Sequence, residues 1–321
     1  MAEVQDDDSA HLVRQLTSLD AQFLAIEDSR NFSHISGLAI LDPSTAPGGS
    51  LDLGDVQRHI EERLHLLPPF RWRLAEVPFG IDHPWWVDDP DFDIEFHVRE
   101  LALPAPGDDA QLAVQVERLV SRPLDRSKPL WEIYLVQGLE RGRVALVPKI
   151  HHAVVDGVSG AEIMGTLFDL EPTGRDVSAP PKKMGSERVP TSLELFGKGV
   201  IAAPWRVAEA AVKLPSTLPY LVEIPTIRGL PGVDLVTRAA DRARRAVPAG
   251  RDGAVLNRSK AKAPRTILNG PVSAHRRVSF GSLSLPAVKL IKDAFKVKVN
   301  DVVVALSAGA CLLYTSDAAD E

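Results

Sequence analysis

Two adjacent histidines, followed by an aspartate and a glycine, are the strongest chemical signal in this sequence. The segment HHAVVDG contains His151 and His152, and Asp156 and Gly157 complete it. An imidazole can take a proton from a hydroxyl near neutral pH, because its ordinary pKa lies close to that pH. Residue frequencies give roughly 0.001 expected chance occurrences of HHxxxDG in a chain of this length. The segment therefore predicts a general base.

Two other roles remain open for the histidines. A histidine at the end of a strand is more often a hydrogen-bonded structural residue than a catalyst. A zinc site is the second alternative, but adjacent residues of an extended strand point to opposite faces. The sequence also has no HExxH segment and no cysteine–histidine cluster to supply further ligands. We therefore expect no metal.

The position of HHAVVDG in the fold follows from the apolar runs around it. WEIYLVQ and RVALVPKI are joined by residues 138–142 and predict a hairpin or two neighbouring buried strands. We expect the second strand to end near Ile150, with a sharp turn before a helix over residues 159–170. A strand end in an α/β fold faces the crevice where ligands lie. Gly157 permits a tight turn, and Asp156 either fixes the tautomer of His152 or braces the loop.

Hydrophobic spacing predicts the remaining elements. We expect a strand over residues 34–41 and a further strand within residues 265–280. We expect helices over residues 18–28, 54–67, 109–121, 193–214 and 285–295, and from residue 300 onward.

Composition limits the class of protein. With 45% hydrophobic and 25% charged residues, the sequence is typical of a soluble globular protein, and its net charge of −6 argues against nucleic acid as a partner. Cys311 is the single cysteine, which excludes an internal disulfide framework. The acidic start MAEVQDDDSAH does not resemble an export signal, and residues 299–313 are too short and interrupted to span a bilayer. We expect a cytoplasmic protein.

The composition changes after residue 175, which suggests three regions. We expect an N-terminal domain over residues 1–175 that carries HHxxxDG. Residues 176–264 are expected to be a linker and crossover containing an amphipathic helix, since the segment begins rich in Pro, Lys and Ser. Residues 265–321 are expected to be a partial C-terminal domain, because one strand and two helices do not close a sheet. We expect residues 314–321 to be non-native.

Three segments together resemble the bacterial wax ester synthase/acyl-CoA:diacylglycerol acyltransferase family. They are HHAVVDG, PLWEIYL at residues 129–135 and VNDVVVAL at residues 299–306. The segments SLDAQFLAIED, LPPFRWRL, PLDRSKPLWE and LNGPVSAHRR also resemble it, in particular its actinobacterial triacylglycerol synthases. HHxxxDG alone is shared with condensation domains of peptide synthetases, whereas its combination with PLW and ND is more specific. Family members continue beyond the point where this chain stops.

The resemblance implies an α/β protein with the two-domain, chloramphenicol acetyltransferase-like fold of CoA-dependent acyltransferases, with the second domain incomplete. It implies transfer of a fatty acyl group from acyl-CoA, as co-substrate, to diacylglycerol or to a long-chain fatty alcohol, with no cofactor. His152 would be the general base, His151 would support the turn, and Asp156 would be mainly structural. A condensation-like amide-forming enzyme and a non-catalytic lipid-binding fragment are the alternatives.

The other two motifs have structural interpretations beside the functional ones. For Pro129, Leu130 and Trp131 we favour packing in the core, while the resemblance connects them with the substrate channel. Asn300 and Asp301 are typical of a helix N-terminus, with Asn300 as the cap and Asp301 complementing the helix dipole.

The substrates implied by the resemblance also make a lipid surface an expected partner. A protein that acts on diacylglycerol without crossing the membrane meets it at an interface, so we expect peripheral association with the inner membrane or lipid droplets. The amphipathic helix at residues 196–214 either rests on that surface or packs against the first domain. Arg276 and Arg277 either face solvent or meet a CoA phosphate. The sequence does not indicate the oligomeric state.

Overall fold

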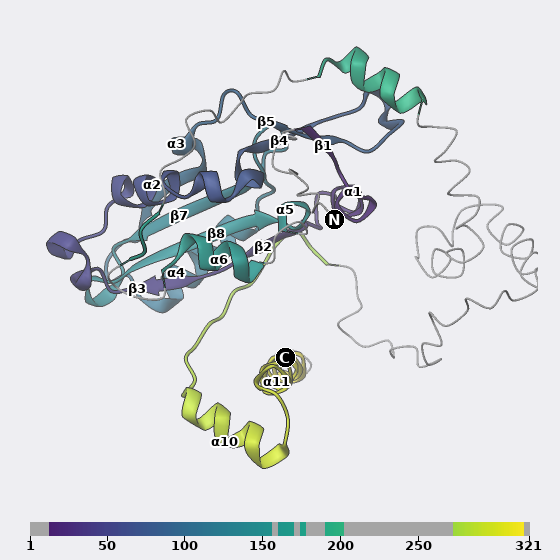
Figure 1. Ribbon diagram of the computed structural model, residues 1–321. Coiled ribbons are helices and arrows are strands. Elements are labelled where there is room, and N and C mark those ends of the chain that lie inside the picture. The colour runs from purple at the N-terminus through teal and green to yellow at the C-terminus, as the bar shows by residue number, and fades with distance from the viewer. Residues whose placement is uncertain (1–12, 156–159, 170–173, 178–189, 202–271, 318–321) are drawn as a thin grey trace, which may run out of the picture. The chain divides into compact units, whose positions relative to one another are not determined.

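The computed structural model describes residues 13–155, 160–169, 174–177, 190–201 and 272–317 (Figure 1). The chain divides into two units, Met1–Arg276 and Arg277–Glu321. Most of the described residues belong to the first unit, which contains the HHAVVDG segment.

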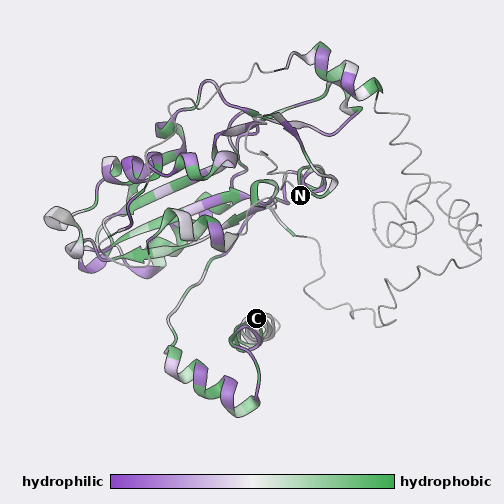
Figure 2. Cartoon of the chain, viewed as in Figure 1, coloured by the Kyte–Doolittle hydropathy of each residue, from purple (hydrophilic) through white to green (hydrophobic). Residues whose placement is uncertain are grey.

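A five-stranded mixed sheet forms the centre of the first unit (Figure 1). Its strands are β2 (His34–Ser36), β3 (Ala39–Leu41), β6 (Val98–Ala102), β7 (Trp131–Gln137) and β8 (Val144–His151). β8 pairs antiparallel with β7 on one side and with β2 and β3 on the other, and β6 lies parallel to β7. The predicted hairpin of two buried strands is confirmed as β7 and β8, which are largely hydrophobic (Figure 2).

The edge of the sheet beside β8 is interrupted at Gly37. We expected one strand over residues 34–41, and this was wrong, because Pro148 in β8 has no N–H to donate across the ladder. The N–H of Gly37 still donates to the carbonyl of Pro148 at 3.0 Å. A Cβ atom on Gly37 would lie 3.4 Å from Cγ of Pro148, which is van der Waals contact, so the edge here lies directly against the proline ring.

Two helices cover one face of the sheet, α2 (Leu53–Glu61) and α6 (Gly160–Leu167) (Figure 1). The apolar face of the helix predicted over residues 54–67 is buried. The helix itself, α2, is shorter than predicted and is followed by a 3-10 turn at Leu64–Leu66. The proline pair that follows excludes helical geometry at Leu67, so the helical run does not continue beyond that turn.

The opposite face is covered by α4 (Asp109–Val120), whose predicted apolar stripe of Leu112, Val116 and Leu119 is buried. The amine of Lys149 in β8 donates to the carbonyl of Arg122, just beyond α4. Successive residues of β8 therefore alternate between an apolar face under α2 and α6 and a partly polar face under α4.

A second, antiparallel sheet and short helices complete the first unit. The sheet has the order β1 (Val13–Gln15), β5 (Trp85–Asp88), β4 (Trp72–Ala75). The helices are α1 (Ser18–Ala25), α3 (Ile94–His97) and α5 (His152–Val155), and α1 lies beside α5. The helix predicted at residues 18–28 is thus confirmed, though it ends earlier than expected.

The helix predicted over residues 193–214 is described only as far as residue 201. Residues 192–201 are helical. Leu195 is buried, and Phe196 meets Phe79 edge to face at the turn between β4 and β5, with ring centroids 6.1 Å apart. Lys198 lies over the ring of Trp85. The described part of this helix therefore packs against β5 and the turn before it.

The second unit contains α10 (Leu285–Phe295), as predicted, and α11 (Val299–Asp317). The strand expected within residues 265–280 is absent from its described part, residues 272–280, where no neighbouring strand pairs with the backbone. The cap role predicted for Asn300 was wrong, because α11 already begins at Val299. Asp301 lies in the first turn as expected, and its carboxylate accepts the N–H of Lys298 at 2.8 Å.

Among the residues that the structure describes, Trp131 is one of the largest fully buried side chains and belongs to the main hydrophobic cluster. Its indole N–H donates to the carbonyl of Phe70 at 2.7 Å, and its ring stacks on His97 with centroids 4.4 Å apart. Nδ1 of His97 also lies 2.7 Å from the carbonyl oxygen of Trp131, so the two residues are joined by a hydrogen bond as well as by ring stacking.

Glu27, two residues beyond α1, connects three parts of the first unit. One carboxylate oxygen accepts the N–H of Ser33 at 2.7 Å, and the other accepts Nη2 of Arg126 at 2.8 Å. Nε2 of His151 lies 3.2 Å from the first oxygen. Burial by itself raises the pKa of Glu27, but the contacts with His151, Arg126 and Ser33 outweigh it and lower the pKa to about 2.

Replacing Trp131 by Phe should lower the free energy of unfolding by about 2 kcal/mol, because the buried carbonyl of Phe70 loses its donor. Urea denaturation followed by circular dichroism measures the change. Trp72→Phe is the control, since Trp72 is only partly buried. An equal loss in both variants would contradict the role given to the indole N–H.

The lowered pKa of Glu27 makes part of the stability depend on pH. The carboxylate contributes its stabilisation fully above the ordinary pKa of 4.5, and this contribution is lost as the pH falls toward about 2. Glu27→Gln should therefore be less stable than the wild type at neutral pH by about 3 kcal/mol, and the difference should shrink below pH 4.5. Urea unfolding across this pH range measures it, with Glu61→Gln at an exposed position of α2 as the control. A pH-independent difference would refute the assignment.

Candidate active site

The two histidines separate at the end of β8. The strand ends at His151 and α5 begins at His152, so the predicted strand end with a sharp turn directly after it is confirmed. The side chain of His151 is buried, with the residue only 1% exposed, whereas His152 is partly exposed. The two rings thus face different surroundings.

The ring of His151 is held from both sides. Nδ1 accepts the N–H of Ala153 at 3.1 Å, so this nitrogen carries no proton. In a neutral ring the proton therefore sits on Nε2, which faces Glu27. The backbone N–H of His151 donates to the carbonyl of Leu130 at 3.0 Å. His151 consequently fixes the start of α5 against the core.

His152 is anchored through its backbone and one face of its ring. Its N–H donates to the carbonyl of Ser33 at 2.8 Å. The imidazole stacks on Phe23 of α1, with centroids 4.8 Å apart and planes inclined by 14°. No described residue hydrogen-bonds to its ring nitrogens. The ring is therefore oriented by packing against Phe23.

Glu27 links these two anchors. It binds His151 on one side and the N–H of Ser33 on the other, and Ser33 in turn holds the backbone of His152. Sequence analysis did not single out Glu27. The sequence feature that could have drawn attention to Glu27 is its place near the end of the SLDAQFLAIED segment. Only the fold shows that its carboxylate reaches His151 of β8.

A second histidine lies beside His151 on the neighbouring strand. His34 pairs with His151 across β2 and β8, and its Nε2 lies 3.0 Å from the carbonyl oxygen of Val120. Burial and the nearby charge of Lys149 lower the pKa of His34 to about 4, so its ring is neutral at physiological pH. Sequence analysis did not single out His34, and Lys149, the one lysine in the apolar run RVALVPKI, was the signal for a polar group at this place.

The other predicted site residues are distributed over three places. Asp156 and Gly157 lie outside the described residues. Pro129, Leu130 and Trp131 are all buried, and Leu130 supports His151 through its carbonyl. Asn300 and Asp301 belong to the second unit, Arg277–Glu321.

Arg276 is held by the first unit. Its guanidinium donates to the carbonyl of Arg30 at 2.7 Å and lies 5.5 Å from the ring centroid of Phe32. Its backbone N–H donates to Oγ of Ser121 at 3.2 Å.

The residues that the structure describes contain neither a metal cluster nor a membrane-spanning helix. Among them, no group of three or more His, Cys, Asp or Glu side chains is arranged to hold a metal ion. In the same part of the chain, no helix is both long and apolar enough to cross a membrane.

Comparison with known proteins gives consistent matches over most of the chain. The family model described as "Wax ester synthase/diacylglycerol acyltransferase catalytic domain" matches residues 16–303. The putative diacylglycerol O-acyltransferase Rv3087 of Mycobacterium tuberculosis is 34% identical over 304 residues, which are 94% of this chain and 59% of the relative. The probable diacylglycerol O-acyltransferase tgs3 of the same organism is 34% identical over 88% of this chain and 97% of its own length.

A solved structure supports the same grouping. The wax ester synthase/diacylglycerol acyltransferase from Marinobacter aquaeolei VT8 superimposes with a TM-score of 0.59 at 26% identity, over 94% of this chain and 61% of that one. The predicted α/β acyltransferase fold class is thereby confirmed. With the histidines at the end of β8 and the family model matching from α1 into α11, the chain belongs to the wax ester synthase/diacylglycerol acyltransferase family.

Proposed function

We propose that this protein transfers a fatty acyl group from acyl-CoA to the hydroxyl of diacylglycerol or of a long-chain fatty alcohol. The observation that carries the proposal is the imidazole of His152, which lies directly after a buried strand and is oriented by stacking on Phe23. Membership in the family supplies the substrate class. The chain spans 59% of the length of the relative Rv3087.

His152 would act as general base and then as general acid. The alcohol oxygen attacks the thioester carbonyl while the imidazole takes the hydroxyl proton. As the new C–O bond forms and the C–S bond breaks, the imidazolium returns the proton to the leaving thiolate of CoA. Charge is thus balanced without an acyl-enzyme.

His151 and Glu27 would position the base without touching the substrate. His151 fixes the first backbone amides of α5, and Glu27 holds both that ring and the loop that binds the backbone of His152. We assign Asp156 an orienting role and Gly157 a role in the turn on the sequence alone. Leu130 and Trp131 support the site from the core.

We also propose peripheral contact with the inner membrane or with lipid droplets. Three large apolar side chains on or beside the helix over residues 192–201 are exposed. Phe79 is 91% exposed, Leu193 79% and Ile201 77%. Phe79 projects from a turn with positive φ and contacts Phe196 of the helix. Exposed apolar side chains grouped in this way are typical of a surface that contacts lipid.

Replacing His152 by Ala should lower kcat by about 10²- to 10⁴-fold, because the attacking hydroxyl loses its proton acceptor. The measurement is transfer from labelled palmitoyl-CoA to diacylglycerol and to hexadecanol, using the full-length protein. His275→Ala, at an exposed histidine, is the control. Undiminished transfer in the His152 variant would remove it as the base. Transfer to amines only, or binding of acyl-CoA without transfer by the wild type, would favour the two alternative functions.

The double variant Phe79→Ser/Ile201→Ser should reduce flotation of the protein with diacylglycerol-containing vesicles. It removes two of the three exposed apolar side chains that would contact the lipid. Val114→Ser, an exposed apolar position on α4, is the control. Equal flotation of all three proteins would contradict the proposed contact surface.

A further inference from the structure

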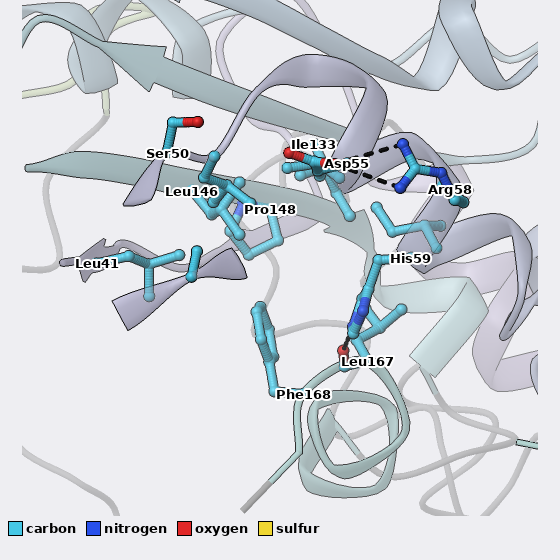
Figure 3. Close-up of a pocket in the computed structure, with 14 residues that line it drawn as sticks. Leu41, Ser50, Asp55, Arg58, His59, Ile133, Leu146, Pro148, Leu167 and Phe168 are labelled. Atoms are coloured by element: carbon cyan, nitrogen blue, oxygen red, sulfur yellow. Dashed lines mark hydrogen bonds and ion pairs between the residues drawn. The ribbon is translucent and has the colours of Figure 1, made fainter. Parts of the chain in front are cut away.

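A cavity of about 380 Å³ lies between the sheet and the two helices on its apolar face (Figure 3). Its floor is formed by Ile133 of β7 and by Leu146 and Pro148 of β8. Figure 3 shows Phe168, directly after α6, standing across an open space from Leu146 and Pro148. The cavity belongs entirely to the first unit.

The charged groups and the histidine around this cavity already have partners within the protein. Nε2 of His59 lies 2.7 Å from the carbonyl oxygen of Leu167. The guanidinium of Arg58 reaches the carboxylate of Asp55 at 3.3 Å, and both side chains are exposed. The remaining wall is mainly aliphatic or aromatic. The cavity therefore offers no unpaired charge to a ligand and suits an uncharged hydrocarbon chain.

The size of the cavity argues against a packing imperfection. Protein interiors are close-packed and contain few voids larger than a water molecule. A volume of about 380 Å³ is instead in the range of sites that hold small ligands. Without a ligand, the apolar lining lacks dispersion contacts on one side.

β8 connects the cavity to the proposed base. Pro148 lies in the floor, and His152 follows it by four residues. At the rise of an extended strand this separation is about 13 Å. A chain whose reacting carbon lies at His152 therefore has to be long to reach the cavity, and a short one does not enter it.

We infer that this cavity binds the distal part of an alkyl chain whose reactive end is held at His152. The inference rests on the proposed function. The shared chemistry is an unbranched hydrocarbon chain, and it has two sources, the acyl group of the donor and the alkyl chain of the acceptor.

Two variants change the volume of the cavity in opposite directions. Ala46 lines it in an extended conformation that any residue adopts, so Ala46→Phe fills it. Phe168→Ala enlarges it. Ser44→Phe is the matched control, because it adds the same ring at an exposed position two residues away. Urea denaturation verifies that each variant is folded.

Initial rates are measured with acyl-CoA from butanoyl to octadecanoyl and a short alcohol, and then with alcohols of varied length and a short acyl-CoA. Ala46→Phe should lower kcat/KM for long chains by about fourfold per methylene group excluded, with short chains unaffected. Phe168→Ala should shift the preference toward longer chains. The series in which the shift occurs identifies the donor or the acceptor as the occupant.

A binding measurement is independent of turnover. The fluorescent fatty acid cis-parinaric acid should bind the wild type and Ser44→Phe equally, and Ala46→Phe more weakly. Unchanged chain-length profiles together with unchanged binding in Ala46→Phe would overturn the cavity assignment while leaving the acyltransferase proposal intact. If the wild type transfers no acyl group, the proposed function fails, and the binding measurement alone decides whether the cavity takes a hydrocarbon chain.

Discussion

The ionised carboxylate of Glu27 is the contact on which the geometry at the end of β8 depends. It brings together a basic side chain, a backbone amide and a buried histidine, none of them adjacent to it in the sequence. Because the three contacts favour the charged form more strongly than burial disfavours it, the carboxylate remains an acceptor throughout the physiological pH range. The loop after α1 is therefore fixed against the strand, and with it the backbone that carries His152.

β8 serves two chemically different environments at once. Its even-numbered side chains from Leu146 lie on the apolar face, where the cavity is found, and Lys149 and His151 lie on the face under α4. Lys149 is buried, and burial lowers its pKa despite the nearby carboxylate of Glu132. A single strand thus separates a hydrocarbon-binding side from a network of hydrogen-bonded polar groups.

Much of this arrangement could be predicted from local patterns. The β7–β8 hairpin, the turn at the histidines and the helices α1, α4 and α10 follow from apolar spacing and from glycine positions. Long-range contacts could not be predicted in this way. Glu27 and Arg126 are far apart in the sequence, and the cavity requires segments from α2, β8 and α6 to meet. The split at Gly37 was missed because it depends on a proline in the partner strand, which spacing along residues 34–41 does not reveal. The helix start before Asn300 was missed because a residue type alone does not define a boundary.

The alternation along β8 also limits which genetic changes the strand can accept. Insertion or deletion of one codon between Val144 and His151 would shift the pleat by one position for every residue that follows. The lysine would then enter the hydrocarbon side, and the two consecutive imidazoles would exchange their buried and accessible positions. The length of β8 is consequently under stronger constraint than the identity of any one aliphatic residue within it.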